Sequence, residues 1–125
     1  MLKFLMLVLA IGLSSVRADW ELISTTDSAH IYIDRDSIQF SETTGSVWEI
    51  QNLQGYDDDD WLSYRYLSQY DCFNRRWMYS AFTKHDGPMA TGEIITRTSK
   101  ASNWLIIPPN TPAATVFKIV CSVKD

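Results

Sequence analysis

The chain has 125 residues, of which 46% are hydrophobic and 13% aromatic, and its formal net charge at pH 7 is −4. This length fits one domain with a hydrophobic core of its own. The acidic balance gives no electrostatic attraction to nucleic acid or to anionic lipid headgroups, so the sequence predicts neither as a partner.

The N-terminus has the order of a secretory signal peptide. Lys3 precedes the apolar run Phe4–Leu13, and Val16 and Ala18 stand at the −3 and −1 positions of a small-residue cleavage site. The alternative is a membrane anchor, but a spanning helix needs about 20 apolar residues, and this run is roughly half as long. No other stretch has the length and hydropathy of a membrane span. We therefore expect cleavage after Ala18, with residues 1–18 as signal peptide.

The expected mature domain, residues 19–125, is more acidic than the precursor. Loss of Lys3 and Arg17 leaves 9 of the 11 basic residues against 15 acidic ones, for a net charge of −6. A bacterial lipoprotein carries its acylated cysteine directly after the cleavage site, where neither Cys72 nor Cys121 lies. The sequence therefore predicts release into the periplasm or beyond, without a lipid anchor.

The two cysteines predict one disulfide, Cys72–Cys121. An exported chain meets an oxidising compartment, in which a pair of cysteines in a small domain usually joins. In the chain-entropy picture, closing a loop of this length stabilises the fold by roughly 4 kcal/mol. The alternatives are two buried thiols or a metal pair, and two thiols without a neighbouring histidine make a poor zinc site.

Alternation of polar and apolar residues, the period of a β-strand, dominates the domain. The expected strands are 20–23, 30–34, 47–53, 63–72, 77–83 and 93–98. Clusters of turn-forming residues separate them at 34–37, 41–45, 74–75 and 86–88.

The last segment has the period of a helix. Thr111 and Pro112 suit the N-cap and first helical position. Apolar residues then recur on one helical face: Ala113, Val116, Phe117, Val120 and Cys121. A final strand is the alternative, because β-branched residues are frequent there. The helix predicts an α+β fold: an antiparallel sheet of five or six strands with one C-terminal helix packed on one face, tied to it by the disulfide.

Catalytic and metal sites have weak support. His30 and His85 are the two histidines, and no nucleophile elbow accompanies either of them. The run Asp57–Asp60 offers carboxylates for calcium, but adjacent carboxylates on an extended chain point to opposite sides, which favours a solvated acidic loop. The sequence therefore predicts a protein without catalytic residues, a metal or another cofactor.

The candidate binding surface lies on the two central strands. Alternating aromatic residues there could form an exposed face suited to a protein partner: Tyr64, Tyr66, Trp77 and Tyr79. The same alternation also fits core residues or cross-strand pairs. Arg75 and Arg76, with Lys84, could add a basic spot for acidic partners, or simply increase solubility.

A series of short motifs resembles the surface-adhesin protein E-like family of bacterial envelope proteins. The series comprises Trp20, Tyr32-Ile33-Asp34 with Ser37-Ile38, Tyr70-Asp71-Cys72, Trp104 with Ile107-Pro108, and Val120-Cys121. It spans residues 20 to 122, and its order and spacing carry the resemblance.

The resemblance implies a bacterial source and a curved antiparallel sheet whose concave side holds a disulfide-tied helix. It also implies an exported, non-enzymatic binding domain, because the family includes an adhesin for host matrix and serum proteins. The absence of the lipoprotein cysteine departs from that adhesin. The alternative function is therefore a periplasmic accessory or structural envelope protein without a host partner.

Overall fold

The computed structural model describes residues 18–53 and 62–123. Two predictions lie outside these residues: the apolar run of the signal peptide and the acidic segment Asp57–Asp60. The described part contains no helix that is long and apolar enough to cross a membrane.

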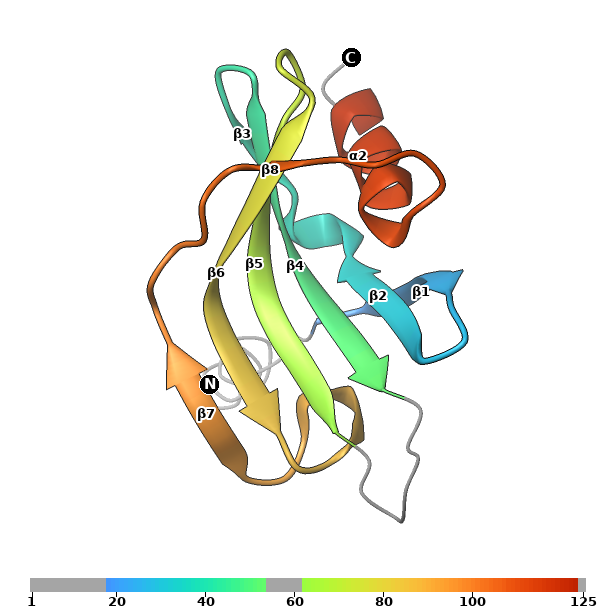
Figure 1. Cartoon of the computed structure of the whole chain (residues 1–125), viewed down its shortest axis with the longest axis vertical. Coiled ribbons are helices and arrows are strands. Elements are labelled where there is room, and N and C mark those ends of the chain that lie inside the picture. The colour runs from blue at the N-terminus through green and yellow to red at the C-terminus, as the bar shows by residue number, and fades with distance from the viewer. Residues whose placement is uncertain (1–17, 54–61, 124–125) are drawn as a thin grey trace, which may run out of the picture.

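The strands form one antiparallel sheet (Figure 1). Its main path runs, in spatial order, β1 (Trp20–Thr25), β2 (Ala29–Asp34), β4 (Thr44–Leu53), β5 (Ser63–Asp71), β6 (Arg76–His85) and β7 (Ile94–Thr98). Two short strands extend it, β3 (Gln39–Ser41) beside β4 and β8 (Leu105–Ile106) beside β6. The 3-10 turns η1 (Arg35–Ser37) and η2 (Pro88–Ala90) lie in two of the connections. The predicted antiparallel sheet of five or six strands is confirmed by the six strands of the main path.

The C-terminal segment is the helix α2 (Pro112–Val123), and the alternative of a final strand is wrong. The Thr111 hydroxyl accepts a hydrogen bond from the Ala114 N–H at 3.2 Å, which caps the first turn as the sequence predicts. Val116, Phe117 and Val120 form the buried face.

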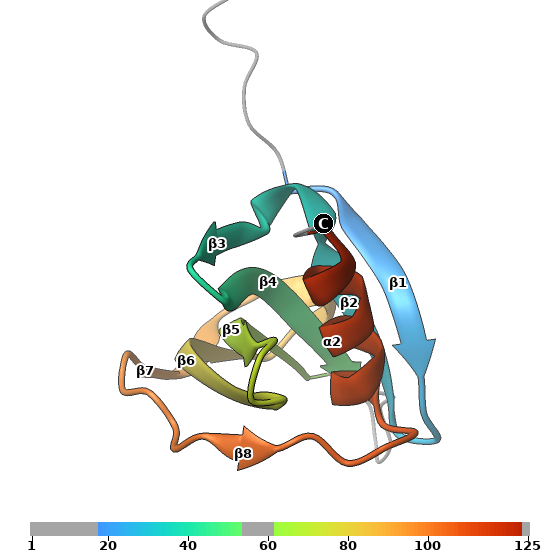
Figure 2. The same ribbon diagram turned by 90° about the horizontal axis from the view of Figure 1, so that it is seen from above.

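The sheet wraps around α2, so that the helix lies on its concave side with the β8 segment closing part of the same side (Figure 2). The core between them consists of buried residues from sheet and helix: Ile33, Val47, Tyr70, Val116, Phe117 and Val120. The disulfide Cys72–Cys121 fixes the C-terminal end of α2 to the end of β5, with Cα atoms 5.8 Å apart. The predicted pairing is confirmed.

The predicted turn 41–45 is too long, because β4 already begins at Thr44. Gly45 therefore lies within a strand, where its missing side chain lets α2 approach. A Cβ atom at this position would come within 2.6 Å of a Val120 methyl group and 2.9 Å of the Phe40 ring. The glycine thus acts as a packing residue under the helix, not as a turn residue.

Candidate functional site

The aromatic side chains of β5 and β6 project from the concave face. Directly opposed residues on neighbouring strands point to the same side of a sheet. Tyr70 opposes Trp77 on one side and Gly45 on the other, and α2 packs over Gly45. Alternation along the two strands places three further rings on the same face: Tyr64, Tyr66 and Tyr79.

Phe82 joins this face through a β-bulge. Arg65 opposes Thr83 and Leu67 opposes Ser80, so both Ala81 and Phe82 lie opposite Tyr66. Ala81 takes a positive φ of 50°, a conformation that lets a strand absorb one extra residue. The bulge shifts the alternation of β6 by one residue, and Phe82 therefore points to the same side as the odd-numbered aromatic residues before it.

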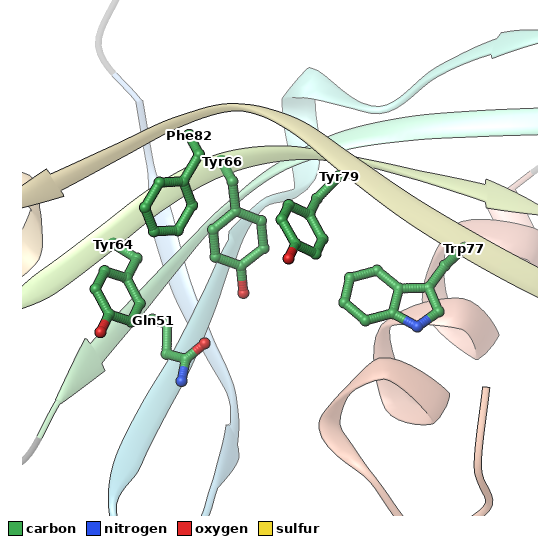
Figure 3. A pocket seen from close by; sticks show the side chains of 6 residues that line it. All are labelled: Gln51, Tyr64, Tyr66, Trp77, Tyr79 and Phe82. Carbon is green, nitrogen blue, oxygen red and sulfur yellow. The ribbon is translucent and has the colours of Figure 1, made fainter. Parts of the chain in front are cut away.

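These side chains line an open hollow of about 210 Å³, which we call the aromatic groove (Figure 3). Its residues come from β4, β5 and β6: Gln51, Tyr64, Tyr66, Trp77, Tyr79 and Phe82. Tyr66 forms the floor and is 8% exposed, whereas the other four rings are partly buried. The groove therefore offers one amide and several ring faces to a ligand.

The rings of the groove contact one another in a continuous series. Ring centroids lie 5.1 Å apart for Tyr64 and Phe82, 5.9 Å for Tyr66 and Tyr79, and 5.6 Å for Trp77 and Tyr79. These separations fall in the favourable range for aromatic pairs. The cross-strand contacts hold the rings in place before any partner arrives, which lowers the entropy lost on binding.

A second hollow, the helix pocket, continues the groove towards α2. It has a volume of about 480 Å³ and is open to solvent. Gln51, Tyr66 and Trp77 line both hollows, so the two adjoin, and together we call them the depression. The wall opposite the sheet comes from β8 and from the start of α2, including Ile106 and Ala113.

Glu49 lies at the floor of the helix pocket. It is 2% exposed, and its Oε2 accepts a hydrogen bond of 2.6 Å from the Tyr70 hydroxyl. Burial raises the pKa of Glu49, while the hydrogen bond from Tyr70 opposes that rise. The hydroxyls of Tyr66 and Ser68 also oppose it, although Ser68 Oγ makes no hydrogen bond of standard geometry within the described residues.

Burial and the nearby Glu49 carboxylate raise the pKa values of Tyr66 and Tyr70 well above their ordinary value of 10.0. Both phenols therefore remain neutral hydrogen-bond donors at physiological pH. The pocket combines apolar walls with one buried carboxyl group and neutral donors, a composition typical of ligand-binding sites.

The predicted basic spot does not form as one cluster. Arg76 pairs with Asp71 at 3.0 Å and stacks over the Trp104 ring at 4.5 Å, while Arg75 stacks over Phe117 at 4.9 Å. Lys84 lies eight residues after Arg76 on β6, roughly 25 Å away by strand geometry. The two arginines support the β5–β6 turn and neighbouring rings, and neither lines the aromatic groove.

The histidines occupy separate structural positions. His85 is buried, and its Nε2 lies 2.9 Å from the Thr83 hydroxyl. His30 Nδ1 lies 3.1 Å from the Thr25 hydroxyl on the neighbouring strand. Within residues 18–53 and 62–123, no group of three or more histidine, cysteine or acidic side chains could hold a metal ion.

The sequence prediction missed several residues of the depression, among them Gln51, Phe82 and Glu49. Strand alternation places Glu49 and Gln51 on the same face as the core residue Val47, so a charged residue on the buried face was the available signal. No such signal existed for Phe82, because its orientation depends on the bulge.

A sequence profile described as surface-adhesin protein E matches residues 20–122. No curated protein sequence matches the chain significantly. Among solved structures, the fold is similar to crystal form II of Haemophilus influenzae protein E, with a TM-score of 0.62, 18% identity, and coverage of 88% of this chain and 92% of that one. Protein E from non-typeable Haemophilus influenzae is also similar, with a TM-score of 0.57, 18% identity, and coverage of 87% and 79%.

The fold and its site define a small, disulfide-bonded sheet domain with an open depression on its concave face. The profile match covers nearly all of the expected mature domain. The chain belongs to the surface-adhesin protein E family.

Proposed function

We propose that this protein is an exported, non-enzymatic domain that binds a protein partner through the aromatic groove. The supporting observation is the partial exposure of four rings, Tyr64, Trp77, Tyr79 and Phe82, on one preformed surface. Aromatic residues are enriched where proteins bind one another and often contribute most of the binding energy.

Membership of an adhesin family makes adhesion to host or matrix proteins the first candidate role. A periplasmic or structural envelope role without a host partner is the second. The two roles differ in where the groove must be accessible. An adhesin presents it outside the cell, whereas an accessory protein uses it inside the envelope.

Surface exposure is the measurement that separates these roles. Antibody labelling and protease treatment of intact cells, compared with osmotically opened cells, would show on which side of the outer membrane the protein lies. Labelling and cleavage on intact cells support adhesion and justify binding assays with host matrix proteins. Signal that requires an opened outer membrane contradicts adhesion and directs the search to envelope partners.

The groove itself is tested with Tyr64→Ala and Phe82→Ala in a binding assay against the partner so identified. Both side chains lie at the end of the groove away from α2. The matched control is Tyr32→Ala, because Tyr32 opposes Ile50 on β4 and therefore projects from the convex face. The proposal expects weaker binding by the first two variants only; equal loss in the control would contradict a groove-specific contact.

A further inference from the structure

The carboxyl group of Glu49 has no basic partner in the described fold. The ion pairs among residues 18–53 and 62–123 join Arg35 to Glu21 and Arg76 to Asp71. None of the described residues that line the helix pocket is basic. Lys84 projects from the same face, but it lies two strands and two residues from Glu49, about 12 Å by sheet geometry. The pocket floor therefore holds a buried acid that hydroxyl groups contact but no cation pairs with, so its ionised form costs free energy.

Aromatic rings surround this acid. Tyr66, Tyr70 and Trp77 all line the helix pocket, and the rings of Tyr70 and Trp77 are stacked with centroids 6.0 Å apart. The faces of aromatic rings carry negative electrostatic potential and attract cations. Apolar wall residues such as Ile31 and Ala113 suit an alkyl chain between the pocket mouth and its floor.

We propose that the helix pocket accepts a lysine side chain from the protein partner, with its ammonium group against Glu49 and its alkyl stem between the rings. This inference rests on the proposed function and names the chemistry recognised within the same depression. Lysine fits better than arginine because the Tyr70 hydroxyl occupies Oε2 of Glu49 and the hydroxyls of Ser68 and Tyr66 also act on this carboxyl group, so its two oxygens are not both open to a ligand. A planar guanidinium binds a carboxylate best through both oxygens, whereas an ammonium needs a single acceptor.

The affinity of the helix pocket for a cation should depend on pH. An adjacent ammonium favours the charged form of Glu49, so below the raised pKa of Glu49 binding must release a proton. Affinity then rises with pH by about tenfold per unit and levels off above that pKa. The phenols of Tyr66 and Tyr70 stay neutral throughout this range, and Lys84 does not line the helix pocket.

The test uses the purified, oxidised protein and Nα-acetyl-lysine N-methylamide as the probe. The matched probe is the norleucine analogue, which keeps the alkyl stem and lacks the ammonium. Binding is followed by calorimetry and by the NMR resonance of the Trp77 indole. The indole of Trp48, which projects from the convex face beside Arg65, serves as internal reference.

The expected result is saturable binding of the lysine probe that shifts the Trp77 resonance and leaves that of Trp48 unchanged. Glu49→Gln keeps the side-chain shape and an oxygen that accepts from Tyr70, so we expect it to fold and to bind the lysine probe roughly tenfold or more weakly. Binding by this variant should also lose its pH dependence. Thermal unfolding of the variant checks its fold.

Equal affinity for the two probes, an unchanged affinity in Glu49→Gln, or no binding of the lysine probe would overturn the inference. None of these outcomes affects the broader proposal, because the Tyr64 and Phe82 variants test partner binding by the aromatic groove independently. Conversely, a lysine site that responds as expected would survive even if those two variants bound the partner normally.

Discussion

The two ends of the concave face differ in what covers them. At one end, α2 and the disulfide bury Val47 and Tyr70 completely against Val116 and Val120. At the other end, rings of the same chemical type remain partly exposed, although they occupy equivalent positions on the same strands. The twelve residues of α2 span a shorter distance than the nine residues of β5 or the ten of β6, because a helix rises less per residue than a strand. The helix therefore covers only part of these strands.

This difference shows that an aromatic residue on the concave face of the sheet is not necessarily buried in the core. Under the helix, a ring such as that of Tyr70 contributes burial energy to folding. Beyond the helix, a ring such as that of Tyr64 is held by cross-strand contacts and remains partly exposed, so a partner can contact it. Substitutions at the covered end should therefore mainly change stability, and those at the open end should mainly change binding.

The largest expected effect comes from removing the disulfide at the covered end. Cys72 and Cys121 are 49 residues apart, and the double variant Cys72→Ser/Cys121→Ser should lose roughly 4 kcal/mol of unfolding free energy. Thermal unfolding should show a fall in Tm of roughly 15–30 °C for a domain of this size. An unchanged Tm would mean that the covalent link does not stabilise this end.

Gly45→Ala should destabilise the protein by about 2 kcal/mol, because the new methyl group overlaps Val120 and Phe40. Ser46→Ala is the matched control, since the neighbouring residue of β4 projects to the other face. Chemical denaturation of both variants checks the prediction. Similar stability for the two would indicate that α2 moves away from the sheet at little cost.

The turn beside the covered end should respond to acid through Asp71. Its carboxylate accepts hydrogen bonds from the backbone and side chain of Asn74 and from Arg76, which lowers its pKa from the ordinary 3.8 to about 2. A lowered pKa stabilises the fold above pH 3.8, and this contribution is lost as the pH falls towards 2.

Asp71→Asn should therefore lose about 1.5 kcal/mol near neutral pH. It should also depend less on pH between 3.8 and about 2 than the unmodified protein does. Urea unfolding at several pH values measures both effects. Parallel pH curves for the two proteins would assign the acid response to other carboxyl groups.

The smallest stability change is expected at the open end. Tyr64→Ala and Phe82→Ala should each cost about 1 kcal/mol, because each ring is only partly buried. Their main effect should be weaker partner binding, measured alongside thermal unfolding. A loss as large as that caused by Gly45→Ala would mean that the open end is core and would weaken the comparison between the two ends.

Much of the fold followed from patterns within short segments. Alternation predicted the strands, the apolar spacing after Pro112 predicted α2, and the two cysteines in an exported chain predicted their pairing. The placement of Tyr64, Tyr66, Trp77 and Tyr79 on one face also followed from alternation. These features depend on neighbours within a few residues, or on the number of cysteines.

The site depended on contacts between segments far apart in sequence. The bulge at Ala81 exists only in the pairing of β6 with β5, and it determines the side on which Phe82 lies. The sequence likewise grouped Arg75 and Arg76 with Lys84, whereas strand length separates them.

The sequence by itself determined the classes of secondary structure, the disulfide and the resemblance to the family, because periodicity and residue type are local properties. The tertiary structure alone decided which end of the sheet α2 covers, and so which aromatic rings are core and which are groove. It also placed Glu49 beneath the pocket, because burial depends on what the rest of the chain packs above a residue.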